Sequence, residues 1–329
     1  MKRRLSPSPH NRHHQHHHVT STISITGITN MNIMETQNLS HTYWRTEAVR
    51  SLTFAIPQGG ACALLGQNGA GKTTTIKMLM NLLRPTAGSA TVLGADSRRL
   101  GPAQFRQIGY VSENQKTPAG MTVRGFLDFC RALYPAWDKA LETKLLALFQ
   151  LPPKRKLAHL SRGMRMKAML LSSLAYRPKL IVMDEPFSGL DPLVRDELTH
   201  GLLELAGAGE WTLLISSHDI DDVERLVDRT VIIEAGKLLL DETLESLQRR
   251  FRRVEIFSPQ PSPVTPPASC IACETNNQHA RWIETQYTIG TEHTCRTLFP
   301  GATFSMHPMT LKEIYIATVK NTAALKGKN

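Results

Sequence analysis

The chain has 329 residues, which is enough for one large domain or two modest ones with a buried core. Its composition, 41% apolar and 20% charged, is typical of a globular protein. The sequence contains no run of about 18 apolar residues, so no membrane-spanning helix is predicted. The net charge of +11 suits an anionic membrane surface or nucleic acid, but a solvated basic surface is the simpler interpretation, because charge alone identifies no partner.

Residues 1–33 are predicted to form a disordered tail. A breaker cluster of alternating serine and proline at residues 6–9 is followed by a low-complexity run of histidines: His10, His13, His14, His16, His17 and His18. No apolar segment follows the positive start, so a secretory signal peptide is not predicted. Metal binding by the histidines is the less favoured interpretation, because a flexible tail offers ligands without fixed geometry.

Strand and helix patterns alternate from Met34 onward. Four apolar runs have the length of buried strands: residues 61–65, 180–183, 212–216 and 230–233. Residues 72–83 and 122–150 are predicted to be helical. This alternation predicts an α/β fold with a largely parallel sheet covered on both faces. A proline- and serine-rich stretch at residues 258–267 is a predicted linker within a small C-terminal accessory region, residues 247–329.

A phosphate-binding pattern directly follows the first of these strands. It has the form G-x-x-x-x-G-K-[ST] and consists of Gly66, Gln67, Asn68, Gly69, Ala70, Gly71, Lys72, Thr73 and Thr74. Glycines let the backbone fold around phosphates with its N–H groups pointing inward, and the following helix adds its positive dipole end. In this pattern Lys72 reaches the β- and γ-phosphates, and the Thr73 hydroxyl is a ligand of Mg²⁺. The flanking strand and helix make a chance match the weaker interpretation.

Two carboxylates end the strand predicted at residues 180–183. Asp184 and Glu185 stand at its carboxyl end, where ligands bind in such sheets. We expect Asp184 to hold Mg²⁺ through water and Glu185 to polarise the attacking water as general base. A surface acidic pair after a core strand is the alternative, and the phosphate-binding pattern makes it the weaker one.

With these motifs in order, the chain resembles the nucleotide-binding subunits of ABC transporters over roughly residues 34–240. Residues 160–164, Leu-Ser-Arg-Gly-Met, stand where this family has its signature, usually Leu-Ser-Gly-Gly-Gln. Residues 188–191, which end in Asp191, resemble the D-loop. His218 resembles the switch histidine that contacts the γ-phosphate. The ordered set carries the resemblance, because each of these short motifs alone is common.

The resemblance implies a P-loop NTPase core of the ABC type, residues 34–246. This core has an antiparallel β-region near the adenine and an inserted helical subdomain at about residues 114–165. Tyr43 lies where the family places an aromatic ring against the adenine, and the neighbouring Trp44 is the alternative; a packing role for Tyr43 also stays open. Two such subunits are expected to sandwich two molecules of ATP with Mg²⁺, because the signature and the phosphate loop of one site come from different protomers.

Two departures from the family pattern concern residues near the phosphates. In this family the signature serine and second glycine hold the γ-phosphate of ATP on the other protomer, and Ser161 and Gly163 keep those groups. Arg162 and Met164 replace the usual Gly and Gln. Glu113 stands where the family usually has a Gln that senses Mg²⁺ and water; a carboxylate is still an oxygen ligand, but its charge would change the strength of the contact. A Glu here resembles some bacterial exporter subunits.

The resemblance favours an exporter. Residues 309–315 resemble the tail of exporter ATPases that have separate membrane subunits. We therefore expect an ATP-hydrolysing subunit at the cytoplasmic face of the cell (inner) membrane, bound to a separate transmembrane permease and a second nucleotide-binding subunit, with no nucleic acid partner. The alternative is a soluble ABC-type ATPase of translation or DNA repair, for which two cassettes, a zinc module or a long coiled coil would be expected. A degenerate module without turnover is disfavoured by intact Lys72, Asp184, Glu185 and His218.

The cysteines carry little predicted chemistry. The five are scattered and odd in number, which argues against a disulfide framework and fits a reducing compartment. Cys270 and Cys273 form a C-x-x-C, but no second ligand pair follows at a spacing typical of zinc sites. Unpaired thiols are the favoured interpretation, with metal or redox use as the alternative.

Overall fold

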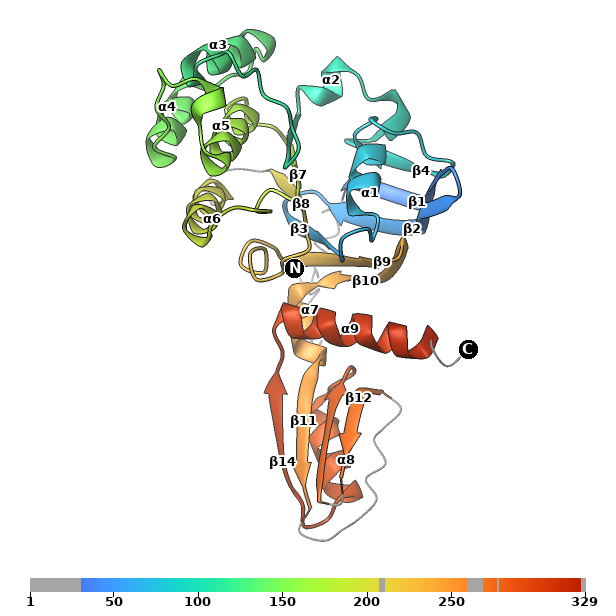
Figure 1. Ribbon diagram of the computed structural model, residues 1–329. Coiled ribbons are helices and arrows are strands. Elements are labelled where there is room, and N and C mark those ends of the chain that lie inside the picture. Colours follow the sequence, from blue (N-terminus) through green and yellow to red (C-terminus); the bar gives the residue numbers. More distant parts are fainter. Residues whose placement is uncertain (1–30, 207–210, 259–268, 277, 327–329) are drawn as a thin grey trace, which may run out of the picture. The chain divides into compact units, whose positions relative to one another are not determined.

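A computed structural model describes residues 31–206, 211–258, 269–276 and 278–326 (Figure 1). The chain divides into a segment of residues 1–30 and a compact unit that begins at Met31. The predicted histidine-rich tail therefore lies, except for its last residues, outside the described part of the chain. The first strand already begins at Asn32, slightly before the expected start of the cassette at residue 34.

A six-stranded sheet forms the centre of the main core, in the order β10-β9-β3-β8-β7-β6. The strands are β3 (Gly60–Leu65), β6 (Ile108–Ser112), β7 (Leu180–Asp184), β8 (Thr212–Ser217), β9 (Arg229–Glu234) and β10 (Lys237–Thr243). Neighbours pair in parallel except β10, which is antiparallel to β9. Every residue of β7 and β8 is buried, as expected for parallel strands covered on both faces. The predicted parallel sheet is confirmed.

An antiparallel sheet of four strands forms the predicted β-region, in the order β2-β1-β4-β5. Its strands are β1 (Asn32–Tyr43), β2 (Thr46–Pro57), β4 (Ala87–Val92) and β5 (Ala95–Asp96). Buried residues of β1 and β2, such as Leu39 and Val49, share one core with helix α1 (Lys72–Leu79) and with Cys62 and Leu64 of β3. The packing therefore fixes this sheet next to the element that carries the phosphate loop.

The opposite face of the main sheet is covered by longer helices. Successive residues of a strand point to opposite faces, so Ala63 and Leu65 of β3 join a second core with α5 and α6. The helices that contribute buried residues to this second core include α3 (Val123–Leu133), α4 (Lys139–Leu148), α5 (Arg162–Leu174) and α6 (Pro192–Ala206). Helix α2 (Pro102–Phe105) has no buried residue, and short 3₁₀ turns lie at Ser97–Arg99 and Leu157–His159. The range expected for the inserted helical subdomain, about residues 114–165, contains α3, α4 and the start of α5.

Two predicted helices are shorter than the sequence pattern indicates. The pattern over residues 122–150 is two helices, because Pro135 disfavours helical backbone at the residue before it, and Tyr134 is extended with φ −119° and ψ 99°. The helix expected over residues 72–83 ends at Leu79. Asn81 has a left-handed φ of 56°, which asparagine tolerates better than most residues, and there the chain turns.

The C-terminal region, for which the sequence predicted no fold, contains in its described residues a small antiparallel sheet and three helices. Its elements are α7 (Leu244–Arg250), β11 (Arg252–Phe257), β12 (Cys270–Thr275), β13 (His279–Glu284), α8 (Ile289–Leu298), β14 (Thr303–Pro308) and α9 (Leu311–Lys326). The strands pair antiparallel in the order β12-β13-β11-β14. Val254, Ile256, Trp282 and Cys295 form a separate small core there.

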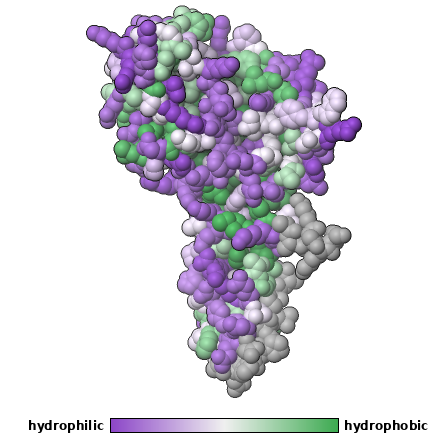
Figure 2. Space-filling view, in the orientation of Figure 1, coloured by the Kyte–Doolittle hydropathy of each residue, from purple (hydrophilic) through white to green (hydrophobic). Residues whose placement is uncertain are grey.

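One face of the described surface is largely polar. Figure 2 shows hydrophilic residues spread over the visible face, between smaller groups of hydrophobic ones. Within the described ranges, none of the helices combines the length and the apolar character needed to cross a bilayer.

Candidate functional site

The phosphate loop connects the carboxyl end of β3 to the start of α1. Gly66 and Gly71 are required there: a Cβ on Gly66 would lie 2.5 Å from the Ile233 carbonyl oxygen, and Gly71 has a left-handed φ of 105°. The Lys72 ammonium folds back over the loop and donates to the carbonyl oxygens of Gly66 (2.6 Å) and Gln67 (3.2 Å). The loop thus presents the amino end of α1 and one buried cation to the same point, which is the arrangement that binds phosphates.

Asp184 lies beside this loop at the end of β7 and is almost fully buried. Its Oδ1 accepts hydrogen bonds from Thr73 Oγ1 (3.1 Å) and Ser216 Oγ (2.7 Å). Burial raises the pKa of Asp184 above its usual range, and the two hydroxyl hydrogen bonds lower it only in part. A buried carboxylate next to a threonine hydroxyl is a hard oxygen donor set, so these residues fit Mg²⁺ with its remaining ligands from phosphate and water.

Glu185 stands between two cationic or potentially cationic groups. Its Oε1 is 2.9 Å from Lys72 Nζ, and its Oε2 is 2.8 Å from His218 Nδ1. The residue has a left-handed φ of 53°, and its backbone N–H donates to Ser216 Oγ (3.0 Å). The structure therefore brings Lys72, Glu185 and His218, predicted from separate motifs, into one group.

Other predicted residues lie outside this group within the one chain. Ser161 precedes α5, and its Oγ accepts a hydrogen bond from the Met164 N–H (3.2 Å). Asp191 precedes α6, and its Oδ1 accepts a hydrogen bond from the Val194 N–H (3.1 Å). Neither side chain bonds to the phosphate loop among the described residues. Tyr43 is 44% exposed and packs edge-on against His41 at a centroid distance of 4.4 Å. These three residues stay candidate nucleotide ligands.

The two departures from the family pattern contact each other. The Glu113 N–H donates to the Asp184 carbonyl oxygen (3.0 Å), and the Glu113 carboxylate forms an ion pair with the Arg162 guanidinium. Arg162 also lies against the D-loop, since a Cβ on Gly189 would be 2.7 Å from its Nη1. Sequence reasoning missed this contact, because it joins residues far apart in the chain.

A second arginine links two of the predicted motifs. Arg195, in the first turns of α6, donates to the Leu190 carbonyl oxygen (2.9 Å) and to the carboxylates of Asp219 (3.0 Å) and Asp222 (2.7 Å). The D-loop is thereby tied to the segment that follows His218. Ser216 and Arg195 were not predicted; the signal for Ser216 is a buried polar residue at the end of a core strand.

Comparison with known proteins agrees with this geometry. The sequence profile of the ABC transporter family matches residues 49–188. The bacitracin transport ATP-binding protein BcrA of Bacillus licheniformis is 32% identical over 223 residues, which cover 67% of this chain and 73% of the relative. The Nod factor export ATP-binding protein I of Burkholderia orbicola is 32% identical over 247 residues, 73% of this chain and 81% of the relative. The chain belongs to the ABC transporter ATP-binding proteins.

Further matches define how far this likeness extends. An uncharacterized ABC transporter ATP-binding protein of Synechocystis is 33% identical, and the match spans 65% of this chain and 63% of that protein's length. A solved structure described as the ATP binding subunit of an ABC transporter is 30% identical, with a TM-score of 0.59 over 66% of this chain and 92% of the other. The fold is therefore that of an ABC-type ATPase subunit, and proteins of this family bind ATP and couple its hydrolysis to transport.

The C-x-x-C lies apart from the ATP-binding core, on β12. The Cys270 thiol is 3.5 Å from Glu284 Oε2, and burial together with this carboxylate raises the pKa of Cys270 well above its usual range. Cys273 is exposed. No group of three or more His, Cys, Asp or Glu side chains in the described ranges is arranged to hold a metal ion, so no third ligand joins the two thiols there.

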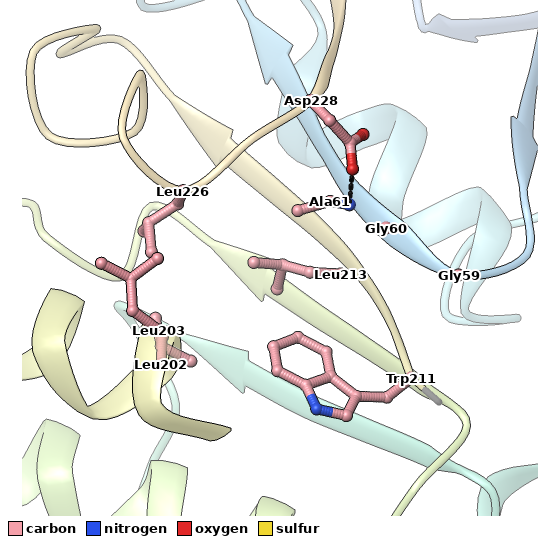
Figure 3. Close-up of a pocket in the computed structure, with 9 residues that line it drawn as sticks. All are labelled: Gly59, Gly60, Ala61, Leu202, Leu203, Trp211, Leu213, Leu226 and Asp228. Carbon is pink, nitrogen blue, oxygen red and sulfur yellow. Dashed lines mark hydrogen bonds between the residues drawn. The ribbon is translucent and has the colours of Figure 1, made fainter. Parts of the chain in front are cut away.

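A cavity of about 190 Å³ lies at the other end of β3 from the phosphate loop (Figure 3). Gly59, Trp211, Leu213, Leu226 and Asp228 are among its lining residues, and Asp228 Oδ2 accepts from the Ala61 N–H (3.1 Å). Ligands of parallel sheets bind at the carboxyl ends of the strands. This cavity, at the amino end of β3, is therefore not part of the nucleotide site.

Proposed function

We propose that this chain is the ATP-hydrolysing subunit of an ABC exporter, which binds ATP–Mg between two protomers and drives transport through a separate membrane subunit. The observation that carries the proposal is the position of Glu185. Its carboxylate lies between Lys72 and His218, next to the Asp184–Thr73 pair and at the mouth of the phosphate loop. A base, a phosphate-binding cation and a metal-binding carboxylate thus converge on one point.

The geometry supports a specific division of roles. The backbone N–H groups of residues 66–74 and the amino end of α1 bind the phosphates. Lys72 Nζ, 2.9 Å from Glu185, can exchange this carboxylate for the γ-phosphate when ATP binds, which leaves Glu185 free to take a proton from water. His218 holds the other carboxylate oxygen and so fixes the direction from which the proton is accepted.

Magnesium fits the same place. Asp184 and Thr73 would hold it, with Glu113 as a further oxygen ligand from the neighbouring strand end. When bound, the ion neutralises charge that develops on the phosphates.

The proposed second protomer completes the site. Ser161 and Gly163 are at the start of α5 and have no bond to the phosphate loop of their own chain among the described residues, which supports a role toward ATP bound by a partner. Export is supported by the similarity to the Nod factor export ATP-binding protein, and a transport function by the similarity to the bacitracin transport protein. We propose a peripheral position at the cytoplasmic face of the membrane and no nucleic acid partner.

This chain has a candidate docking groove for the membrane subunit. A cavity of about 340 Å³ lies between the main sheet and the helical subdomain, and the exposed apolar side chains of Leu82, Phe105 and Leu133 line it. Gln115, close in sequence to Glu113, lines it as well. A segment of a membrane protein bound there would contact Gln115, and residues 113–115 would connect it to the nucleotide site.

Co-purification from detergent tests the proposal. The tagged full chain should recover an integral membrane protein, and the complex should release phosphate from ATP–Mg faster than the isolated chain. Phe105→Asp should reduce the recovery without changing ATP binding. Recovery of ribosomes or DNA in place of a membrane protein would favour the soluble alternative.

A further inference from the structure

Glu113 and Arg162 replace two uncharged residues of the family pattern, and they form one ion pair. The carboxylate follows β6 on the main sheet, and the guanidinium is on the first residue of α5 in the helical subdomain. Their side chains are 26% and 45% exposed. Exposed ion pairs contribute little to stability, so folding alone does not account for two charges introduced at the nucleotide site.

The position of Arg162 at the start of α5 favours a negatively charged group beside it. The amino end of a helix carries partial positive charge and favours negative groups, yet α5 begins with an arginine and has no acidic residue in its first turn. Residues 151–183 contain no Asp or Glu at all. Glu113, from another segment, supplies the missing anion in this chain.

A phosphate is the other anion that suits this position. Arg162 is flanked by Ser161 and Gly163, the residues proposed to meet the γ-phosphate of ATP on the partner protomer. A guanidinium binds phosphate and carboxylate with the same donor geometry. Arg162 therefore has two alternative partners: the carboxylate of its own chain and the phosphate held by the other.

Glu113 has two alternative partners as well. Its backbone N–H is bonded to the Asp184 carbonyl oxygen (3.0 Å), which keeps its carboxylate close to the proposed magnesium position. An oxygen that accepts a bond from Arg162 is less available as a metal ligand. The ion pair thus competes with two contacts of the proposed nucleotide site: that of Glu113 with magnesium and that of Arg162 with phosphate.

From this contact we propose that Arg162 is a positioning residue that withholds Glu113 from magnesium until ATP on the partner protomer draws the guanidinium away. The inference rests on the proposed two-protomer site. Because Glu113 serves the ATP of its own chain and Arg162 the ATP of the partner, the exchange couples the two nucleotide sites. Such coupling is reciprocal, so magnesium bound at one site also favours ATP binding at the other.

Binding of Mn²⁺, as a probe for the Mg²⁺ site, tests the first half of the inference. Paramagnetic resonance titration of the full chain with saturating ADP measures the Mn²⁺ affinity without turnover. Arg162→Gln should raise this affinity by about tenfold, the usual size of effects of groups that contact metal ligands. Glu113→Gln should remove the gain when it is combined with Arg162→Gln, whereas Arg162→Lys should restore wild-type behaviour because it keeps a cation opposite Glu113.

Arg165→Gln is the matched control, because it removes one positive charge from the same helix without touching the ion pair. It should leave the Mn²⁺ affinity unchanged. Equal affinities of Arg162→Gln and Arg165→Gln, or a gain that persists in the Glu113→Gln double variant, would overturn the inference while leaving the proposed function intact. Wild-type protein that binds no Mn²⁺ in the presence of nucleotide would overturn both.

The ATP dependence of hydrolysis tests the coupling. Wild-type protein should show a sigmoidal curve, and Arg162→Gln should lower the Hill coefficient toward about 1. Arg165→Gln should keep the wild-type curve. A hyperbolic wild-type curve, or unchanged cooperativity in Arg162→Gln, would overturn the coupling between the sites.

Discussion

At the scale of single residues, Glu185 concentrates the proposed chemistry. The carboxylate is bonded on both sides, by Lys72 and His218, and its backbone is held in a left-handed conformation by Ser216. Such backbone costs free energy and persists only where its surroundings hold it, which is typical of functional sites. The side chain of Glu185 contacts Lys72 of the phosphate loop directly after the buried strand β7.

Replacement of this carboxylate should separate binding from turnover. Glu185→Gln is nearly isosteric and keeps hydrogen-bonding capacity, but it cannot take a proton from water. We expect its turnover to fall by about 10²–10⁴, while ATP affinity persists because the contacts to phosphate come from residues 66–74 and Asp184. The unhydrolysed ATP should then hold two protomers together, which gel filtration with light scattering measures with and without ATP.

Lys72→Ala serves as the contrasting variant for this experiment. It removes the buried ammonium that donates to the phosphate loop, so it should lose ATP binding and with it the dimer. A Glu185→Gln protein that stays monomeric and hydrolyses ATP at the wild-type rate would contradict the role of Glu185.

Most of this site could be predicted from the sequence. Lys72, Thr73, Asp184 and Glu185 belong to two contiguous motifs that each follow a strand, and parallel strands bring such ends to one edge of the sheet. The contact of Glu113 with Arg162 could not be predicted, because it depends on how α5 packs over the end of β6. The order of motifs identifies the site residues, but it does not predict which side chains from different strands and helices contact each other.

At the scale of elements, one buried carboxylate holds the helical subdomain together. Glu142 on α4 is only 2% exposed and accepts hydrogen bonds from Arg124 (2.7 Å), Arg131 (2.6 Å) and Trp137 (2.7 Å). Arg124 and Arg131 are on α3, so the two helices separated by Pro135 are joined again through this side chain. Burial raises the pKa of Glu142, but the bonds from Arg131 and Trp137 outweigh it and leave the pKa below its usual range.

This carboxylate should contribute stability that depends on pH. Because the folded-state pKa of Glu142 is lowered, its contribution is present above the ordinary Glu pKa of about 4.3 and is lost as the pH falls through the folded-state value. We expect Glu142→Gln to lower the free energy of unfolding in urea by about 1–3 kcal/mol at pH 7. The difference from wild type should shrink as the pH falls below about 4.

An exposed acid provides the control for this measurement. Glu245 on α7 has a side chain that is 87% exposed, so Glu245→Gln should leave the urea midpoint nearly unchanged. A pH-independent difference between Glu142→Gln and wild type would show that shape, not charge, carries the effect.

The sequence predicted the elements of the core better than those of the C-terminal region. Strands β7 and β8 are continuous apolar runs, which buried parallel strands require. Strands β11 to β14 form a sheet with one strongly packed face, and β12 is mostly exposed, so their patterns are short and weak. The predicted ends of two helices were wrong because Pro135 and Asn81 interrupt helices that the spacing of apolar residues alone would continue.

At the scale of the whole chain, residues 1–30 should be dispensable for ATP hydrolysis. Their sequence is rich in breakers and histidine and cannot bury a core. The first strand begins at Asn32, and the Met31 carbonyl oxygen accepts from the Gln58 N–H (3.0 Å), so a chain that starts at Met31 keeps this contact. We expect such a chain to keep the wild-type rate of phosphate release, and a large loss would assign a function to the tail.

The last described helix, α9, packs against the main core although it follows the small C-terminal sheet. Leu311, Ile314 and Tyr315 of α9 are buried in the same hydrophobic cluster as α5, α6 and one face of the main sheet. The Leu311 N–H donates to Glu224 Oε1 (2.9 Å), and Lys312 pairs with Asp221, both acids lying in the segment after His218. Helix α9 therefore contacts the segment that follows His218, the candidate switch histidine.

Truncation of one α9 side chain should consequently weaken the nucleotide-binding core itself. Leu311 is fully buried, and Leu311→Ala removes apolar contacts and leaves a cavity, which costs about 2–5 kcal/mol. Calorimetry with and without ATP–Mg identifies the transition of the core, because bound ligand raises its Tm. That transition should shift down in Leu311→Ala, whereas Ile316→Ala, at a site 41% exposed on the same helix, should leave it nearly in place. If the ATP-sensitive transition of Leu311→Ala stays at the wild-type temperature while another transition moves, α9 belongs to an independently folding C-terminal unit and does not stabilise the nucleotide-binding core.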